Sequence, residues 1–204
     1  MSTALTNIET EKQLIPALRF NEFDEDWSSF ALKDITPIDE KYGIVDGPFG
    51  SNLKTIHYKE EGVPIITSGY VTNGYFYAKK YLFVTPEKFL KEKRSAVRAG
   101  DIVMAKIGAR CGASAILPKK HETSILSGNA LKITVDESRF STMVIWQQLY
   151  HLYTTHKIDL LKTVGAQPAI SIANLKKFKV VVPNLPEQQK IASFLSAVDE
   201  KIQQ

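Results

Sequence analysis

Residues 185–204 are the segment that most constrains how this chain folds. Pro186 and Glu187 suit the first turn of a helix, because proline has no amide hydrogen to lose there and a carboxylate faces the positive end of the helix dipole. Apolar side chains then recur at spacings of four, three and four, with one aromatic beside them: Ile191, Leu195, Val198 and Ile202, flanked by Phe194. Most other positions are polar, so the pattern predicts a coiled-coil-forming helix whose apolar seam packs against a partner.

Composition describes an ordinary globular chain. Its 204 residues, 44% of them hydrophobic, suffice for one domain of about 150–200 residues plus an appendage. The single cysteine, Cys111, excludes an internal disulfide and fits a reducing, cytoplasmic location. No neighbouring histidine supports a nucleophilic role for it. No stretch approaches the roughly 20 apolar residues of a membrane span, and the polar start does not match a signal peptide.

Charge is unevenly distributed along the chain. The net charge is +4, but residues 1–30 hold two basic and six acidic side chains, whereas residues 86–120 hold nine basic and three acidic ones. A basic middle is typical of a surface that meets a polyanion. A well-solvated face accounts for the same charges equally well, so both interpretations stay open at this point.

The pattern of short apolar runs and turn residues predicts an α+β fold that is mostly β. The predicted strands, each bounded by Gly, Pro, Asn or Ser, cover residues 42–46, 63–67, 76–84, 101–106, 113–117, 130–135 and 179–182. One amphipathic helix is predicted over 140–156, and a short turn over 174–178. The expected organisation is a flexible tail over 1–15, a globule over 16–184 and the terminal helix over 185–204.

The sequence contains no recognisable catalytic motif. It has neither G-x-x-x-x-G-K-[ST] nor G-x-G-x-x-G, the loops that cradle nucleotide phosphates. The four histidines are scattered, and no cysteine or carboxylate cluster completes a metal site. The chain also lacks the Pro-Pro pair of the motif with which amino-methylating DNA enzymes grip a flipped base. We therefore expect no enzymatic activity, no metal and no cofactor in this chain.

Binding chemistry is better represented than catalysis. Three loops, 47–54, 68–74 and 106–110, combine glycines with donors suited to base edges and phosphates, and a lysine pair follows nearby. The candidate DNA-binding residues are Ser51, Asn52, Lys54, Ser68, Tyr70, Asn73, Lys106, Arg110, Lys119 and Lys120. For any single residue an ordinary turn is an equal interpretation.

Several motifs occur in a family-specific order. They are P-A-L-R-F-N-E-F at 16–23, G-P-F-G-S-N-L-K at 47–54, G-D-I-V-M-A-K-I-G at 100–108, T-V-G-A-Q-P-A-I-S at 163–171, L-K-K-F-K-V-V-V-P at 175–183, and L-P-E-Q-Q-K-I-A-S-F-L-S-A-V-D-E-K-I at 185–202. Each motif alone is weak, but their order and spacing cover most of the chain. The chain thus resembles the specificity subunits of type I DNA restriction-modification systems.

The resemblance implies a function and a set of partners. Residues 16–184 would be a target-recognition domain that reads one half-site of double-stranded DNA, and residues 185–204 would begin the conserved spacer helix. In that family the subunit docks modification subunits, which methylate adenine with S-adenosylmethionine, and a restriction subunit joins the full complex. The chain itself would be a non-catalytic DNA-binding subunit.

One departure from the family pattern bears on assembly. The usual member has two recognition domains and two long antiparallel helices, whereas this sequence has one domain and one helix about 25 Å long, at about 1.5 Å per residue. A natural half-subunit, a frameshift product and an expressed fragment all fit. Two copies would restore two half-sites if their terminal helices paired antiparallel about a two-fold axis.

Two functions from other classes remain alternatives to DNA recognition. One is an assembly module that uses the terminal helix for protein–protein interaction and binds no DNA. The other is a stand-alone DNA enzyme, which the absent motifs count against.

Overall fold

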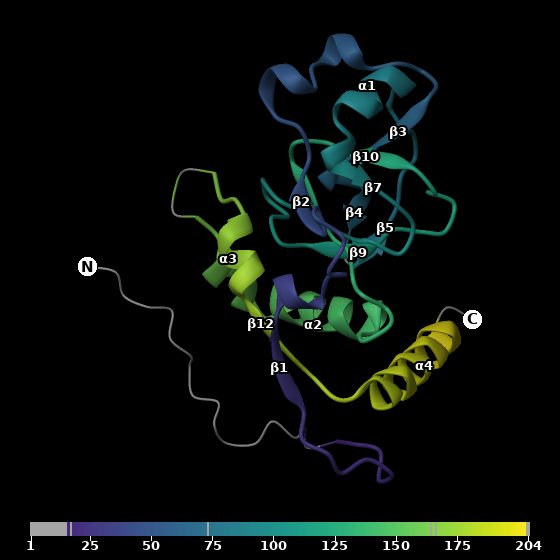
Figure 1. Cartoon of the computed structure of the whole chain (residues 1–204), viewed down its shortest axis with the longest axis vertical. Helices are drawn as coiled ribbons and strands as arrows, with labels where there is room; N and C mark the ends of the chain where they lie inside the picture. Colours follow the sequence, from purple (N-terminus) through teal and green to yellow (C-terminus); the bar gives the residue numbers. More distant parts are fainter. Residues whose placement is uncertain (1–15, 17, 73, 164, 166, 203–204) are drawn as a thin grey trace.

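Two four-stranded sheets form the centre of the computed structural model of this chain (Figure 1). The structure describes residues 16, 18–72, 74–163, 165 and 167–202. The first sheet has four antiparallel strands in the order β2 (Ile44–Asp46), β11 (Ala130–Ile133), β8 (Ile102–Ala105) and β9 (Ser114–Ile116). The second has the order β6 (Phe83–Val84), β3 (Val63–Ile66), β10 (Ser124–Leu126) and β7 (Ala96–Val97), with β3 and β10 parallel.

The remaining elements surround these two sheets. Two antiparallel pairs complete the strands: β1 (Ser28–Ala31) with β12 (Lys179–Val182), and β4 (Val71–Thr72) with β5 (Tyr75–Phe76). The helices are α1 (Pro86–Lys91), α2 (Thr142–Thr154), α3 (Ile172–Lys177) and α4 (Leu185–Ile202). The α+β, mostly β fold with a C-terminal helix is thereby confirmed.

Alternation along the strands gives the first sheet two buried faces. Ile102 and Met104 of β8 join the cluster that includes the apolar side of α2, whereas Val103 between them joins a second cluster. Successive side chains of a strand point to opposite faces, so both sets are buried at once. On α2, Trp146 adds a hydrogen bond from its indole N–H to the carbonyl of Ser114 in β9, at 3.0 Å. The helix is thus fixed against the sheet edge.

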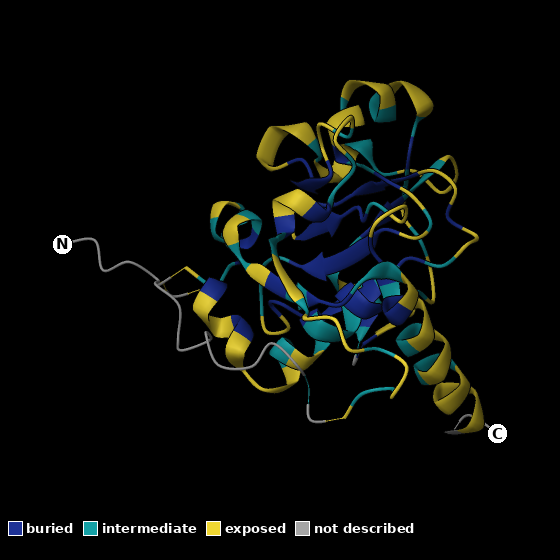
Figure 2. Cartoon of the chain, turned by 60° about the horizontal axis from the view of Figure 1, so that its bottom comes forward, coloured by how far each residue is buried: buried dark blue, intermediate teal, exposed yellow. Residues whose placement is uncertain are grey.

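The second sheet repeats this arrangement one layer further out. Ile66 and Leu126 join the cluster shared with the first sheet, while their neighbours Ile65 and Ile125 join a third cluster that packs against Phe89 of α1. The layers therefore run from α2 through both sheets to α1. Burial is concentrated in the strands and α2, and the outer helices expose most of their surface (Figure 2).

Some elements differ from those that the sequence pattern predicts. The predicted strand 76–84 is the end of β5, a turn and then β6. The predicted turn 174–178 is largely the helix α3, which begins after Ser171, whose hydroxyl accepts the N–H of Asn174 at 3.3 Å. Strands β1, β4, β7 and β10 and the helix α1 were not predicted. The predicted tail over 1–15 lies outside the described residues.

Gly47 provides a sharp test of the packing. A Cβ at this position would lie 2.0 Å from the carbonyl oxygen of Ser127, which is backbone and has little room to move. We expect Gly47→Ala to lower the free energy of unfolding by about 3 kcal/mol or more, measured by urea denaturation. Gly50→Ala is the matched control: a φ of +58° strains an alanine, although not the native glycine, and no atom lies within 4 Å of the added Cβ. It should cost only about 1–2 kcal/mol, and equal losses would contradict this packing.

Candidate functional site

Lys106 is the point at which loops distant in the sequence meet. It follows β8, and its Nζ lies 2.5 Å from Oδ2 of Asp46 at the end of β2 and 4.3 Å from the ring centre of Phe49. Its backbone N–H donates to the carbonyl of Asn129 at 2.8 Å, just before β11 begins. The ion pair and the cation–π contact reinforce one another, because both hold the ammonium group in one place.

Two of the family motifs are in contact beside Lys106. The N–H of Ile170 donates to the Lys106 carbonyl at 2.8 Å, and Ile107 forms an isolated antiparallel bridge with Ala169. The motif at 163–171 therefore lies against the motif at 100–108, although more than fifty residues separate them in the sequence. We use the name loop surface for the loops 47–54, 67–72, 106–110 and 127–129.

Asn129 belongs to the loop surface but was not among the predicted residues. Its side-chain oxygen accepts the N–H of Ser68 at 3.3 Å and the hydroxyl of Ser127. It therefore joins the second predicted loop to the turn that precedes β11. Its only sequence signal was the pair Gly128-Asn129, which is typical of any turn.

Arg110 fastens the third predicted loop to the second. Its Nη1 donates to the carbonyl of Val71 at 3.0 Å and to the hydroxyl of Thr72 at 2.5 Å, while the residue as a whole is exposed. Two of its five N–H donors therefore have partners within the protein, and the guanidinium lies at the surface. The predicted residue Asn73, next to Thr72, lies outside the described residues.

Tyr70 anchors the loop 67–72 to the residues around Lys80 and Tyr81. Its hydroxyl donates to the carbonyl of Lys80 at 2.8 Å, and its ring meets that of Tyr81 edge-on at 5.3 Å. Burial raises the pKa of the Tyr70 hydroxyl. A half-buried ring with a satisfied hydroxyl positions the loop, so Ser68 beside it is the better placed to meet a ligand.

The residues predicted in the first loop stand at the edge of the loop surface. Ser51 and Asn52 lie in the 3-10 turn Gly50–Asn52, and Lys54 follows it; all three are exposed. Gly50 adopts a φ of +58°, a left-handed conformation that glycine takes without strain. These side chains have the exposure that a contact with another molecule requires.

The predicted lysine pair lies on a different turn. Lys119 and Lys120 follow β9, and Nζ of Lys120 lies 5.8 Å from the ring centre of Tyr81. His121 after them is buried and lies 3.0 Å from the Tyr81 hydroxyl, measured to Nε2. The structure therefore brings together Ser68, Lys106 and Arg110, but places the lysine pair beside this aromatic cluster instead.

A basic groove of about 690 Å³ adjoins the loop surface. Its charged lining residues are Glu40, Lys91, Lys93, Arg94, Arg98, Glu122 and Lys132. Arg94 connects the groove to the loop surface, since its Nη2 lies 3.3 Å from Oδ1 of Asp46, the carboxylate that also holds Lys106. Much of the positive charge counted over residues 86–120 is thus gathered here.

Other chemistry is sparse in the part of the chain that the structure describes. Within it, no group of three or more His, Cys, Asp or Glu side chains is placed to hold a metal ion. Cys111 is 1% exposed, and burial raises the pKa of its thiol, which disfavours the reactive thiolate. None of the described helices is long and apolar enough to cross a membrane.

The terminal helix α4 is joined to the globule by its first turns. Gln188 is buried; its side-chain oxygen accepts the N–H of Ser141 and its Nε2 donates to the carbonyl of Pro183, both at 2.8 Å. Ile191 packs against the main core cluster. Further along, Phe194 is 57% and Val198 37% exposed, with Leu195 half-buried between them. The predicted seam therefore starts inside the protein and becomes exposed towards its end.

Comparison with known proteins assigns the family. The sequence profile described as "Type I restriction modification DNA specificity domain" matches residues 24–204. The chain therefore belongs to this family, which confirms the resemblance carried by the motifs.

Individual relatives agree with this assignment. The type I restriction enzyme MjaVIII specificity subunit of Methanocaldococcus jannaschii is 24% identical over 186 residues, covering 89% of this chain and 41% of that protein. A solved structure titled for complex assembly and conformational transition of the type I R-M system has a TM-score of 0.64 at 15% identity, covering 88% of this chain and 40% of the other. The HsdS subunit from Thermoanaerobacter tengcongensis has a TM-score of 0.61 at 16% identity, covering 86% and 38%. The chain spans about two fifths of the length of these relatives.

Protonation of His121, which contacts the Tyr81 hydroxyl, is expected to make the stability of the fold depend on pH. Burial, assisted by the charge of Lys120, lowers the pKa of His121 below its usual 6.5. The unfolded chain therefore binds this proton more readily, and the stability present above the unfolded pKa is lost as the pH falls through the folded one. His121→Gln removes the titration and keeps a polar partner for Tyr81. Urea denaturation between about pH 7.5 and pH 5 should show a smaller loss for the variant, and parallel curves would contradict the assignment.

Proposed function

We propose that this chain is a DNA-recognition unit of a type I restriction-modification complex and reads one half-site of duplex DNA through the loop surface. The observation that carries the proposal is the convergence of the motif loops on Lys106, next to a basic groove. Loops that are distant in sequence and gather at one sheet edge form a surface able to contact one ligand at several points. Residues 16–184 are the proposed recognition domain, and 185–204 the start of the spacer helix.

The loop surface and the adjoining basic groove suit different parts of DNA. The DNA sequence is read by side chains such as Arg, Lys and Asn that contact base edges. Lysines that contact phosphates bind DNA of any sequence. Asn52, Lys54 and Arg110 belong to the first set because loops carry them outward. The exposed Lys91 and Lys93 of the groove belong to the second, because exposed lysines act as point charges on long, flexible stems.

We further propose that the catalytic activities, DNA methylation and cleavage, belong to partner subunits. The chain would dock a modification subunit that methylates adenine with S-adenosylmethionine, and a restriction subunit would join through that complex. The sequence supports this, since it lacks the phosphate-cradling and base-gripping motifs of such enzymes. The later part of the α4 seam, at half-buried Leu195 and exposed Val198, is the proposed contact for the modification subunit or for a second copy of this chain.

One observation favours an alternative without DNA. Lys106 is paired with Asp46, and Arg110 donates to Val71 and Thr72, so both candidates have structural roles already. In the alternative the basic groove is solvated surface and the chain is an assembly module acting through α4. The next two experiments separate these functions.

Two double variants test DNA binding, one by the loop surface and one by the basic groove. We expect Asn52→Ala with Lys54→Ala to reduce discrimination between the target and unrelated duplexes by about 1–3 kcal/mol. Lys91→Ala with Lys93→Ala should instead weaken binding to all sequences and make the dependence of log K on log salt shallower by about two. Fluorescence anisotropy over a salt series, on a target defined by methylation-site sequencing, measures both effects.

The control for these variants lies elsewhere on the protein. Lys177→Ala with Lys179→Ala removes the same charge from exposed positions on α3 and β12. It should change neither discrimination nor the salt slope by as much. Equal weakening by all three double variants, or no DNA binding by the parent together with a modification subunit, would favour the assembly module.

A second experiment tests the α4 seam. Leu195→Asp with Val198→Asp should abolish self-association and docking of the modification subunit, because a carboxylate loses hydration when an apolar seam closes. Ser193→Asp with Ala197→Asp, at exposed positions off the seam, is the matched control and should preserve both. Light scattering over a concentration series, with and without the modification subunit, gives the masses. Short helices pair weakly, so the subunit should strengthen self-pairing. A monomer under both conditions would contradict the two-copy arrangement.

A further inference from the structure

The segment 18–27 lies along one side of the first half of α4. Contacts along the helix include those of Arg19 with Glu187, Glu22 with Lys190, and Phe20 with Phe194. The helix residues are spaced by three and four, which places them on one face of α4. The contacts therefore follow the helix for about two turns, from Glu187 to Phe194, beside the turns that also pack on the globule.

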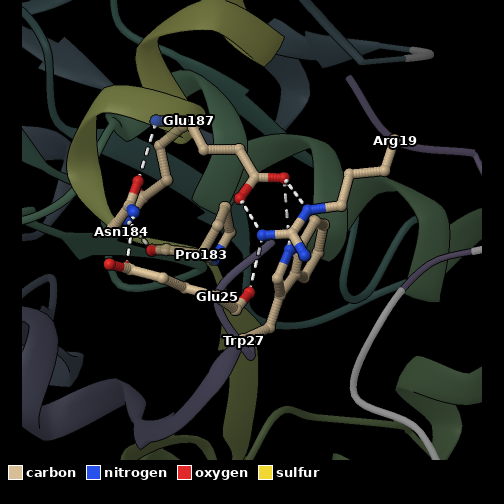
Figure 3. Close-up of polar contacts among 7 residues, drawn as sticks. Arg19, Glu25, Trp27, Pro183, Asn184 and Glu187 are labelled. Atoms are coloured by element: carbon tan, nitrogen blue, oxygen red, sulfur yellow. Dashed lines mark hydrogen bonds and ion pairs between the residues drawn. The ribbon is translucent and has the colours of Figure 1, made fainter. Parts of the chain in front are cut away.

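The strongest contact is a two-pronged ion pair between Arg19 and Glu187 (Figure 3). Nε and Nη2 of Arg19 each donate to one carboxylate oxygen at 2.7 Å, and the indole N–H of Trp27 lies 3.4 Å from the same carboxylate. The side chains of the pair are only 10% and 1% exposed, for Arg19 and Glu187 respectively. Parallel hydrogen bonds of this kind fix direction as well as distance, which a lysine in the same place would not do.

The start of α4 is tied to the same segment by its cap. The side-chain oxygen of Asn184 accepts the N–H of Glu187 at 3.0 Å, which satisfies one free donor of the first turn. Its Nδ2 donates to Oε2 of Glu25 at 2.7 Å, and Arg19 also donates to the Glu25 carbonyl at 2.6 Å (Figure 3). Both the helix cap and the buried carboxylate are therefore held by one short stretch of chain.

The pairing of β1 with β12 holds together the two segments that meet here, 18–27 and the start of α4. Segment 18–27 leads into β1, and β12 leads into α4; the two strands pair from Ser28↔Val182 to Ala31↔Lys179. The contacts of Arg19 thus continue the β1–β12 pairing past its last residues. Loss of the Arg19 side chain alone would leave the Glu187 carboxylate buried with the Trp27 indole as its remaining side-chain donor among the described residues, which is costly for a charge.

We infer that Arg19 and Glu187 are positioning residues that set the direction in which α4 leaves the recognition domain. This inference rests on the proposed function: if the chain reads a half-site, Arg19 and Glu187 help to determine the spacing between two half-sites. A subunit or second copy that docks on α4 is placed at a fixed distance from the loop surface only if the helix direction is fixed. The seam residues Leu195, which is half-buried, and Val198, which is exposed, lie on the neighbouring helix face and further along it.

The inference is tested first on the chain alone, without DNA. Spin labels at Glu200→Cys on α4 and Lys177→Cys on α3 report the helix direction, and a second pair at Lys59→Cys and Lys177→Cys reports the globule. Cys111→Ser serves as the background, since its hydroxyl keeps the donor that Sγ offers the Lys106 carbonyl. In the parent, pulsed electron spin resonance should give one narrow distance for each pair. Arg19→Ala should lose the narrow 177–200 distance and keep the 59–177 one.

Two further variants give the expected order of effects. Arg19→Lys should restore the 177–200 distance only in part, because it keeps the charge but not the two-pronged geometry. Lys190→Ala should leave the distance narrow, because its pair with Glu22 is half-exposed on both sides. An unchanged 177–200 distance in Arg19→Ala overturns the inference. Broadening of both pairs overturns it as well, since Arg19 would then hold the whole globule.

A second measurement carries the inference to DNA. In complex with the modification subunit, methylation-site sequencing of the parent should show half-sites separated by one gap length. Arg19→Ala should methylate sites with several gap lengths while the half-site bases stay the same. An unchanged gap overturns the role in spacing. If the parent binds no DNA at all, the proposed function fails, whereas the spin-label result on helix direction still stands.

Discussion

Burial of the sheet β2–β11–β8–β9 on both faces is the constraint on which the rest of the structure depends. Because the strands are antiparallel and in register, with Asp46 opposite Leu131 and Ala130 opposite Ala105, the end of β2, the start of β11 and the end of β8 share one edge. A slip by one residue would move every buried side chain to the wrong face. The loops after β2 and β8 and the turn before β11 are therefore held side by side at that edge, because burial on both faces does not permit another register.

At that edge, one carboxylate organises much of the positive charge. Asp46 pairs with Lys106 of the loop surface and with Arg94 of the groove. A side chain already held in place loses less conformational entropy when it contacts a ligand, so such pairs suit recognition of defined groups. The same carboxylate repels phosphates, which leaves phosphate contacts to the exposed lysines of the groove. The basic residues therefore fall into two groups: Lys106 and Arg94, which are paired with Asp46, and exposed lysines such as Lys91 and Lys93. The net charge alone does not distinguish these groups.

Local patterns predicted the elements whose burial is periodic. The strand at 130–133, the helix at 142–154 and the terminal helix follow apolar spacings that are visible in the sequence. Short elements escaped prediction because they are stabilised by neighbours: α1 is only six residues long, and its signals were the cap Thr85 and the following Pro86. Asn129 is a similar case in the candidate site, since its importance comes from Ser68, 61 residues away.

By itself, the sequence determined the family, the mostly β fold class and the existence of an apolar seam on α4, because motifs and periodicity are local properties of the chain. Only the tertiary structure decided which parts of that seam are available. Ile191 packs against the core, so the exposed part begins later along the helix than the pattern suggests, and Phe194, still 57% exposed, meets Phe20 on one side. The pair between Arg19 and Glu187 spans 168 positions. No spacing rule connects residues so far apart, because their meeting depends on the β1–β12 pairing that folding brings about.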